Sequence, residues 1–232
     1  MGLTRNSTGR QAAGIFPGTR DASAQEKRIA LAGNPNVGKS TLFNALTGMK
    51  QHTGNWPGKT VSVAAGHCRS TLHSSLLVDL PGTYSLMAHS PEEEIARDFL
   101  CFGGADAAVV VCVGSCLVRS LNLALQTLEL VPRVLICVNL MDEAERRRLR
   151  LNLPRLSSAL GVPVIGTSAH NRTSVRDLAE ALDLLMEHPQ ASLARPLSYP
   201  APLEAAQQQL EPQHTPQIAA PLPQRSQAQR QL

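Results

Sequence analysis

A glycine-rich segment offers the clearest chemistry in this sequence. Residues 33–40 read Gly-Asn-Pro-Asn-Val-Gly-Lys-Ser, between an apolar run at 29–32 and a helix-forming run at 41–46. In that context backbone N–H groups close around phosphate oxygens at a helix N-terminus, where the helix dipole also favours an anion. Lys39 would reach the β- and γ-phosphates, and the Ser40 hydroxyl would bind Mg²⁺. The sequence therefore predicts a phosphate-binding loop with eight contact residues: Asn34, Pro35, Asn36, Val37, Gly38, Lys39, Ser40 and Thr41.

A second motif supplies a carboxylate for the metal. Asp79-Leu80-Pro81-Gly82 ends the apolar run 76–78. Asp79 can hold Mg²⁺ through water, and the Gly82 N–H can sense a γ-phosphate. Because Asp-x-Pro-Gly is also an ordinary turn, the tetrapeptide is informative only together with the phosphate-binding loop.

Two further motifs bear on the base. Asn139-Leu140-Met141-Asp142 follows the apolar run 134–138, and Ser168-Ala169 follows a third predicted strand. A buried Asp142 carboxylate would accept hydrogen bonds from guanine N1–H and the exocyclic amine, a donor pair that adenine does not present. Asn139 and Met141 would complete the base site, and the loop with Ser168 and Ala169 would close over it. The order of the motifs favours GTP over ATP.

The pattern of apolar runs predicts the elements that position these residues. Short apolar runs alternate with segments of helical period, which is typical of an α/β fold. We expect a P-loop GTPase fold with a six-stranded, mostly parallel sheet and helices on both faces. The strands are expected at 28–32, 59–66, 72–79, 107–113, 133–138 and 163–166. The helices are expected at 39–47, 91–102, 118–130, as a short pair within 143–160, and at 174–187.

Composition sets the domain organisation and excludes several classes of protein. The chain has 232 residues, of which 43% are hydrophobic and 3% aromatic, so a core would be built from aliphatic side chains. We expect a disordered leader at 1–27, an α/β domain at 28–188 and a Pro/Gln-rich tail at 189–232. The net charge of +4 is mild, and the one tight basic cluster, at 146–150, is typical of a solvated helix end rather than a nucleic-acid surface.

The cysteines and the apolar runs suggest where the chain works. Five cysteines at irregular spacing indicate buried free thiols in a reducing compartment, and a metal site at Cys112 and Cys116 is not expected. No apolar run approaches the roughly 20 residues that span a bilayer. We therefore expect a soluble cytoplasmic chain without a membrane span.

The order of motifs over residues 28–188 resembles the Ras-like, translation-factor-related G domain. Residues 54–61, 79–86 and 90–100 are similar to the G domain of the ferrous iron transport protein B family. The resemblance implies an antiparallel second strand and switches at 51–61 and 79–90. It also implies that Thr60 completes the Mg²⁺ shell when GTP is bound. The expected activity is slow, Mg²⁺-dependent hydrolysis of GTP to GDP and phosphate, with Lys39, Thr60 and Gly82 as the catalytic residues.

The absence of an arginine from both switches suggests a monovalent cation. Neither switch range contains an arginine, and Thr83 stands where Ras-like enzymes place a water-orienting glutamine. The side-chain oxygen of Asn36 could bind K⁺ beside phosphate oxygens, and the family links asparagine at this place to potassium-stimulated hydrolysis. The alternative is that Asn36 only caps a turn.

The resemblance also implies a partner. The family continues into a helical domain and a membrane transporter, and residues 197–206 look like the entry to that helical domain. We expect a regulatory role for a ferrous iron transporter at the cytoplasmic face of the inner membrane, and no iron conduction by this chain alone. Two departures, Lys59 and Gly114-Ser115, leave open a nucleotide-binding regulator without turnover. A ribosome- or RNA-associated assembly GTPase is the other alternative.

Overall fold

The computed structural model describes residues 27–48, 51–55, 61–69, 74–87, 90–102, 105–168 and 171–187. Two expected site residues, Thr60 and Ala169, lie outside the described residues, as do Trp56 and Lys59. Apart from Lys27, which begins the first strand, the expected leader and the tail also lie outside them.

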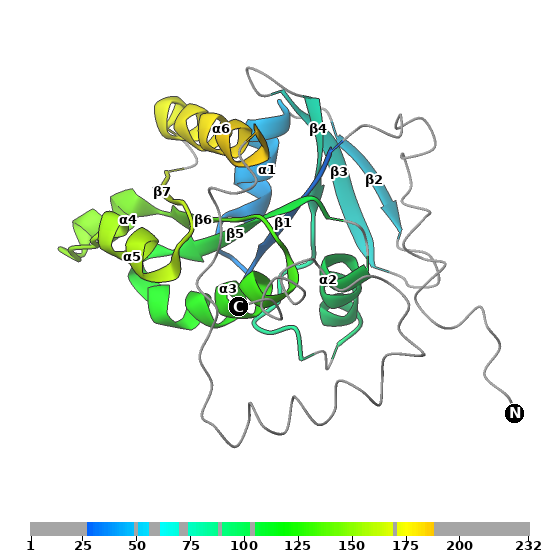
Figure 1. The fold of residues 1–232 in the computed structure, drawn as a ribbon, viewed down its shortest axis with the longest axis horizontal. Helices are drawn as coiled ribbons and strands as arrows, with labels where there is room; N and C mark the ends of the chain where they lie inside the picture. The colour runs from blue at the N-terminus through cyan, green and yellow to red at the C-terminus, as the bar shows by residue number, and fades with distance from the viewer. Residues whose placement is uncertain are drawn as a thin grey trace, which may run out of the picture. The chain divides into compact units, whose positions relative to one another are not determined.

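One mixed sheet organises the described residues (Figure 1). Its seven strands lie in the order β2-β3-β4-β1-β5-β6-β7. Strands β4, β1, β5, β6 and β7 are mutually parallel, whereas β3 runs antiparallel to both β2 and β4. The bounds are β1 Lys27–Gly33, β2 Gln51–Asn55, β3 Ser62–Arg69, β4 Ser74–Asp79, β5 Ala107–Val113, β6 Val134–Asn139 and β7 Val164–Gly166.

The α/β fold, the mostly parallel sheet and the antiparallel second expected strand are confirmed. All six expected strands are present, and β2 extends the sheet by a further strand within the range expected to be a switch. Its sequence, Gln-His-Thr-Gly-Asn, has no apolar alternation, and its pairing with β3 from Gln51↔Gly66 to Asn55↔Ser62 is what makes it a strand. The strand expected at 59–66 is β3, which begins at Ser62 and pairs with β4 as far as Arg69↔Ser74.

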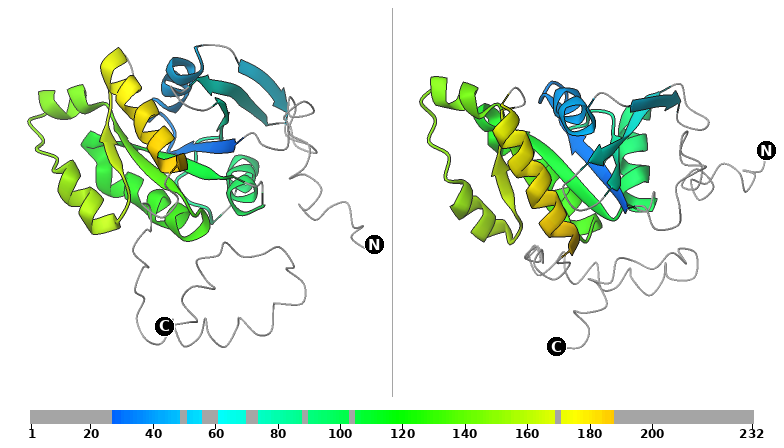
Figure 2. Two further views of the ribbon diagram at one scale, coloured as in Figure 1. Left: turned by 45° about the horizontal axis from the view of Figure 1, so that its top comes forward. Right: turned by 90° about the horizontal axis from the view of Figure 1, so that it is seen from above.

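Helices cover both faces of the sheet (Figure 2). Helices α1 and α6 pack on one face, around buried residues such as Leu31, Phe43 and Leu178. Helices α2 and α3 pack on the other face, with α5 beside them. The bounds are α1 Lys39–Thr47, α2 Pro91–Phe102, α3 Leu117–Leu130, α4 Met141–Arg146, α5 Leu153–Leu160 and α6 Arg172–Glu187, with a 3₁₀ turn, η2, at Gly114–Cys116.

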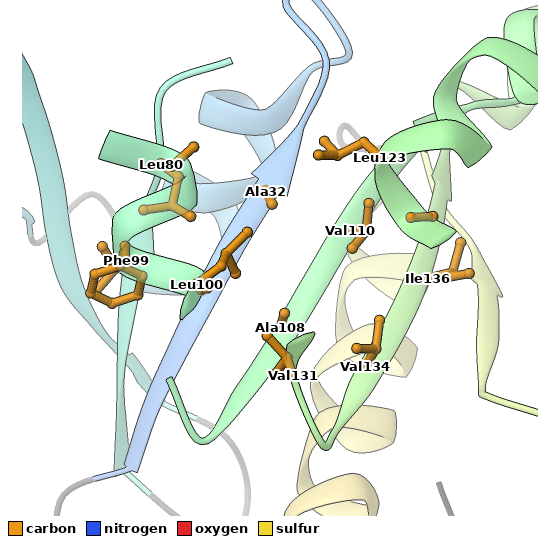
Figure 3. Close-up of a cluster of buried hydrophobic side chains, with 14 of the residues drawn as sticks. Ala32, Leu80, Phe99, Leu100, Ala108, Val110, Leu123, Val131, Val134 and Ile136 are labelled. Carbon is orange, nitrogen blue, oxygen red and sulfur yellow. The ribbon is translucent and has the colours of Figure 1, made fainter. Parts of the chain in front are cut away.

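Small side chains on the central strands let the helices approach closely (Figure 3). Ala32 of β1 and Ala108 of β5 are fully buried beside larger side chains from α2 and α3, including Leu100 and Leu123. This alternation of large and small residues fills the space between helix and sheet without strain. The carboxyl ends of the strands are thereby held rigidly in place.

The cysteines are free thiols, as expected. Cys68, Cys112 and Cys137 are buried, and Cys116 is exposed. Burial raises the pKa of the Cys68 thiol to about 11 and the pKa values of Cys112 and Cys137 to about 12. These three thiols stay protonated at neutral pH. No helix within the described ranges is long and apolar enough to cross a membrane.

Candidate functional site

The loops that follow β1, β4, β6 and β7 carry most of the predicted chemistry. Because these four strands are parallel, their carboxyl ends meet at one edge of the sheet, where open α/β sheets place their ligands. Residues 34–38 follow β1, 80–83 follow β4, 140–142 follow β6 and 167–168 follow β7. The topology thus gathers four sequence motifs that are up to about 130 positions apart.

The loop after β1 makes a tight turn into α1. Asn36 and Gly38 have φ angles of 62° and 79°, in the left-handed region, and Gly38 leads directly into the first residue of α1. A Cβ on Gly38 would lie 2.5 Å from Asn139 Nδ2, so only glycine fits this approach. The backbone therefore wraps around the N-terminus of α1, which is the arrangement that binds phosphate oxygens.

Lys39, Ser40 and Asp79 meet at that helix terminus. The Lys39 ammonium pairs with Asp79 Oδ1, and the Ser40 hydroxyl donates to Asp79 Oδ2 over 3.0 Å. Lys39 is buried, with only 9% of the residue exposed. The structure therefore brings together the expected phosphate-binding lysine and two of the three expected Mg²⁺ ligands, while the third, Thr60, lies outside the described residues.

The donor set fits Mg²⁺ rather than a metal held by protein alone. Mg²⁺ prefers oxygen ligands and is usually bound by one or two carboxylates together with substrate phosphates. Ser40 and Asp79 supply one hydroxyl and one carboxylate in direct contact. Within the described ranges, no group of three or more His, Cys, Asp or Glu residues could hold a metal ion. A Mg²⁺ shell here would need further oxygen ligands, such as water and bound phosphate.

The segment after β4 lies against the phosphate-binding loop. Leu80 N–H donates to the Leu31 carbonyl over 3.0 Å, and Thr83 N–H donates to the Gly33 carbonyl over 3.1 Å. A Cβ on Gly82 would lie 3.0 Å from the Cα of Pro35, so the two loops are in backbone contact. A change in the backbone of the loop after β1 would therefore be felt directly by Gly82.

The Thr83 hydroxyl is turned inward. Thr83 is buried, and its Oγ1 lies 2.6 Å from the Ser85 carbonyl and 3.2 Å from Glu93 Oε1, while it accepts from Ser85 N–H. This side chain stabilises the turn at 83–85 instead of facing the phosphate-binding loop. It cannot orient a water in the way a glutamine would.

Asn139 connects two loops. It is fully buried; its Nδ2 donates to the Val37 carbonyl over 2.9 Å, and its Oδ1 accepts from Thr167 Oγ1 over 3.1 Å. Thr167 is buried too, and its hydroxyl lies 3.0 Å from the Cys137 thiol. Sequence reasoning missed Thr167, whose signal was a polar residue directly after an apolar strand and before Ser168.

Asp142 and Ser168 come together, but the expectation of a buried carboxylate is wrong. The Asp142 side chain is 51% exposed, because the residue lies in the first turn of the surface helix α4, after Leu140 in a left-handed conformation with φ of 57°. Ser168 Oγ donates to Asp142 Oδ1 over 3.1 Å, and Arg146 pairs with Oδ2 over 3.1 Å. The Ser168 hydrogen bond and then Arg146 lower the pKa of Asp142.

The remaining expected residues of the site occupy different surroundings. Asn34 is buried, and its Oδ1 has no hydrogen-bond partner, so it could accept from a further donor at this edge. Pro35 and Asn36 are exposed, as is Thr41 on the outer face of α1. Met141 lies against the strand β7, where a Cβ on Gly166 would be 3.3 Å from its Cγ.

Comparison with known proteins identifies the family. The sequence model of the family described as Ferrous iron transport protein B matches residues 27–182. This chain belongs to that family. The match covers every described loop of the candidate site.

The curated relatives are much longer than this chain. This chain is 43% identical over 159 residues to the Fe(2+) transporter FeoB of Escherichia coli K12. The matched region covers 67% of this chain and 21% of the relative. The FeoB transporter of Salmonella typhimurium is 42% identical over the same length and with the same coverage. The chain thus spans about a fifth of the length of these relatives.

Solved structures of the family have the same fold. The cytosolic domain of L. pneumophila FeoB has a TM-score of 0.75 at 35% identity, covering 83% of this chain and 81% of that one. The cytosolic domain of T. maritima FeoB in its GMPPNP form has a TM-score of 0.75 at 36% identity, covering 82% and 75%. The separate G domain of T. maritima FeoB has a TM-score of 0.64 at 40% identity, covering 71% and 99%.

Proposed function

We propose that residues 28–188 form a G domain that binds GTP and GDP. The observation that carries this proposal is the junction of Lys39, Ser40 and Asp79 at the N-terminus of α1, with Asp142 and Ser168 at the same edge of the sheet. The first group suits phosphates and Mg²⁺, and the second suits a guanine base. Relatives solved with GDP and in a GMPPNP form support it.

A competition titration tests guanine binding. A fluorescent GDP analogue is bound to the wild-type chain with Mg²⁺ and displaced by unlabelled GTP, GDP or ATP. GTP and GDP should displace it at far lower concentrations than ATP, because only guanine presents two donors to the Asp142 carboxylate. Equal displacement by ATP and GTP would refute guanine recognition.

We further propose that the chain hydrolyses GTP slowly. In this reaction Mg²⁺, when bound, neutralises charge on the β- and γ-phosphates. Lys39 and the backbone N–H groups of residues 36–40 hold the phosphates, Ser40 and Asp79 orient the metal, and the Gly82 N–H reads the γ-phosphate. In this mechanism no side chain of the site attacks the γ-phosphate, so the rate of hydrolysis depends on positioning and on charge neutralisation. The inward-turned Thr83 hydroxyl supports slow turnover.

Two substitutions test this mechanism. Thr60 is proposed to close on Mg²⁺ only when GTP is bound, so Thr60→Ala should lower single-turnover hydrolysis and leave GDP affinity unchanged.

Asn36 is proposed to bind K⁺, and hydrolysis should then be faster in KCl than in NaCl at equal ionic strength. Asn36→Ala should remove that difference and preserve GTP binding. Equal rates of the wild-type chain in both salts would refute the cation site.

We propose that the nucleotide state of this domain regulates a ferrous iron transporter on the cytoplasmic side of the membrane. The support is the family match and the names of the longer relatives. Ferrous iron accumulation in cells carrying the wild-type gene or Lys39→Ala tests the idea. Lys39→Ala should lower accumulation because it weakens nucleotide binding, and undiminished accumulation would contradict the proposal.

A further inference from the structure

Helix α3 presents a polar stripe to the segment that follows Gly82. Arg119, Asn122 and Gln126 are spaced three and four positions apart, so they lie on one face of the helix. All three contact residues 84–86, which lie about 40 positions earlier in the chain. None of the three belongs to the candidate nucleotide site. The stripe therefore connects α3, outside the candidate nucleotide site, to the loop after β4.

Gln126 makes the principal contacts of this stripe. Its Oε1 accepts from Leu86 N–H over 2.7 Å and lies 3.2 Å from Ser85 Oγ, and its Nε2 donates to Ser85 Oγ over 3.1 Å. The orientation of the amide follows from chemistry, because a backbone N–H can be met only by an oxygen. One side chain thus holds two successive residues of the segment.

Weaker contacts extend the attachment by one residue. Asn122 Nδ2 donates to the Tyr84 carbonyl over 3.4 Å. The Arg119 guanidinium stacks over the Tyr84 ring, 4.2 Å from its centroid. Tyr84 is 41% exposed, so this cation–π contact is weakened by solvent. Gln126, which binds the partly buried end of the segment, is the better anchor.

The segment is thereby held at both ends and in the middle. Its first residue, Leu80, bonds to Leu31, and Thr83 bonds to Gly33, both on β1. Its far end is held by Gln126. The helix that carries Gln126 is itself fixed, because Leu123 is fully buried against the sheet. Gly82 lies between Leu80 and Thr83. The Thr83 hydroxyl lies 2.6 Å from the Ser85 carbonyl and accepts from Ser85 N–H, so the hold of Gln126 on Ser85 reaches Gly82 through the turn at 83–85.

We propose that Gln126 is a positioning residue for the Gly82 segment. Its side-chain amide fixes residues 85–86 on α3 and so sets where the Gly82 N–H stands relative to the phosphate-binding loop. The inference rests on the proposed GTPase function only for its effect on turnover. The attachment itself is a property of the fold and can be measured without hydrolysis.

Two substitutions separate the hydrogen bonds from the packing. Gln126→Met keeps the length and volume of the side chain and removes every hydrogen bond to residues 85–86. Gln126→Glu keeps two oxygens that accept from Leu86 N–H and Ser85 Oγ–H. Amide hydrogen exchange of residue 86 is measured for both variants and the wild-type chain. Exchange of the buried strand β5 in the same samples shows that each variant is folded.

Hydrolysis and GDP affinity provide the second readout. Gln126→Met should speed exchange at Leu86 roughly threefold to tenfold, the range for one lost hydrogen bond. It should lower kcat by roughly threefold to a hundredfold, as expected for a misplaced group, with GDP affinity unchanged. Gln126→Glu should restore both exchange and kcat to near the wild-type values.

Each contrary result has a distinct meaning. Wild-type exchange at Leu86 in Gln126→Met, with β5 protected, would overturn the attachment. Faster exchange with unchanged kcat would overturn the positioning role. A wild-type chain that binds no guanine nucleotide would refute the proposed function and the effect on turnover together, and the exchange difference would still decide the attachment.

Discussion

At the scale of single residues, the candidate site separates groups proposed to hold phosphates from a group proposed to select the base. The buried Lys39 and the exposed Ser40 meet the carboxylate of Asp79, whereas Asp142 lies at the surface with Ser168 and Arg146. The Lys39 ammonium can make strong charge-assisted contacts with phosphate. The half-exposed carboxylate of Asp142 can be reached by both donors of a guanine base.

Asp142→Asn tests base selection at this scale. The new amide would present an N–H donor to a guanine donor, so GTP affinity should fall about tenfold to a hundredfold, the loss expected for a charge-assisted pair. Xanthosine triphosphate, which carries an acceptor at the corresponding position, should bind the variant better than GTP does. The measurement is a competition titration with both nucleotides, and an unchanged preference for GTP would show that Asp142 does not contact the base.

The low pKa of Asp142 gives this residue a pH dependence of its own. Because the pKa of Asp142 is lowered, its carboxylate stays ionised at pH values where an ordinary aspartate begins to be protonated. It is protonated only when the pH falls through the lowered value. The terminal phosphates of GTP and ATP titrate alike at about pH 6. The preference for GTP over ATP, followed by titration at a series of pH values, should therefore stay constant from neutral pH down to about pH 5. A loss of that preference at or above that pH in a folded chain would mean that another group controls base selection.

At the scale of elements, the two ends of α1 show how one residue type serves different needs. Gly38 and Gly48 flank the helix, and both have left-handed φ angles, of 79° and 64°. A Cβ on Gly38 would strike Asn139 Nδ2, whereas a Cβ on Gly48 would meet nothing within 4 Å. The first glycine thus serves both conformation and close contact, and the second serves conformation alone.

Alanine at each of these glycines tests this difference. Gly48→Ala should cost about 1–2 kcal/mol, the strain of a left-handed conformation. Gly38→Ala should cost more than that and should also weaken nucleotide binding, because it displaces the Asn139 side chain that bridges to Val37. Urea unfolding and GDP titration measure the two effects. Equal stability losses with full GDP affinity in Gly38→Ala would contradict the close contact.

A second element-scale prediction concerns α3. Leu123 is fully buried against the sheet, and Val118, in the first turn, is 87% exposed. Leu123→Ala should lower the free energy of unfolding by about 2–5 kcal/mol through the cavity it leaves. Val118→Ala should stay within about 0.5 kcal/mol of the wild-type value. Chemical unfolding measures both, and comparable losses would mean that α3 packs differently.

At the scale of the whole molecule, the chain combines a sheet-based domain with a tail of different composition. Residues 211–232 are rich in glutamine and proline and poor in apolar side chains, so ordering them would not be repaid by burial. Deleting them should leave the melting temperature and the GTPase rate unchanged. A thermal melt and a phosphate-release assay check this, and a clear drop in melting temperature would show that the tail stabilises the domain.

The sequence alone was sufficient to predict that Lys39, Ser40 and Asp79 lie together, and to predict most of the elements that carry the candidate site. Helices α1 and α2 and strand β5 have the expected bounds, because their signals are local: a P-loop before α1, Pro91 at the start of α2 and an unbroken apolar run in β5. The junction of Ser40 and Asp79 follows from two parallel strands that end at one edge.

Only the tertiary structure decided features that depend on contacts between distant segments. Strand β2 has no apolar alternation and exists through its pairing with β3. Asn139 was expected at the base. In the structure it accepts a hydrogen bond from Thr167, 28 positions away, and donates one to Val37 of the phosphate-binding loop. The exposure of Asp142 and the hold of Gln126 on residues 85–86 likewise depend on which elements pack together. Local patterns record how a segment folds and which face it buries, whereas a polar side chain takes its partners from whatever the finished packing brings within reach.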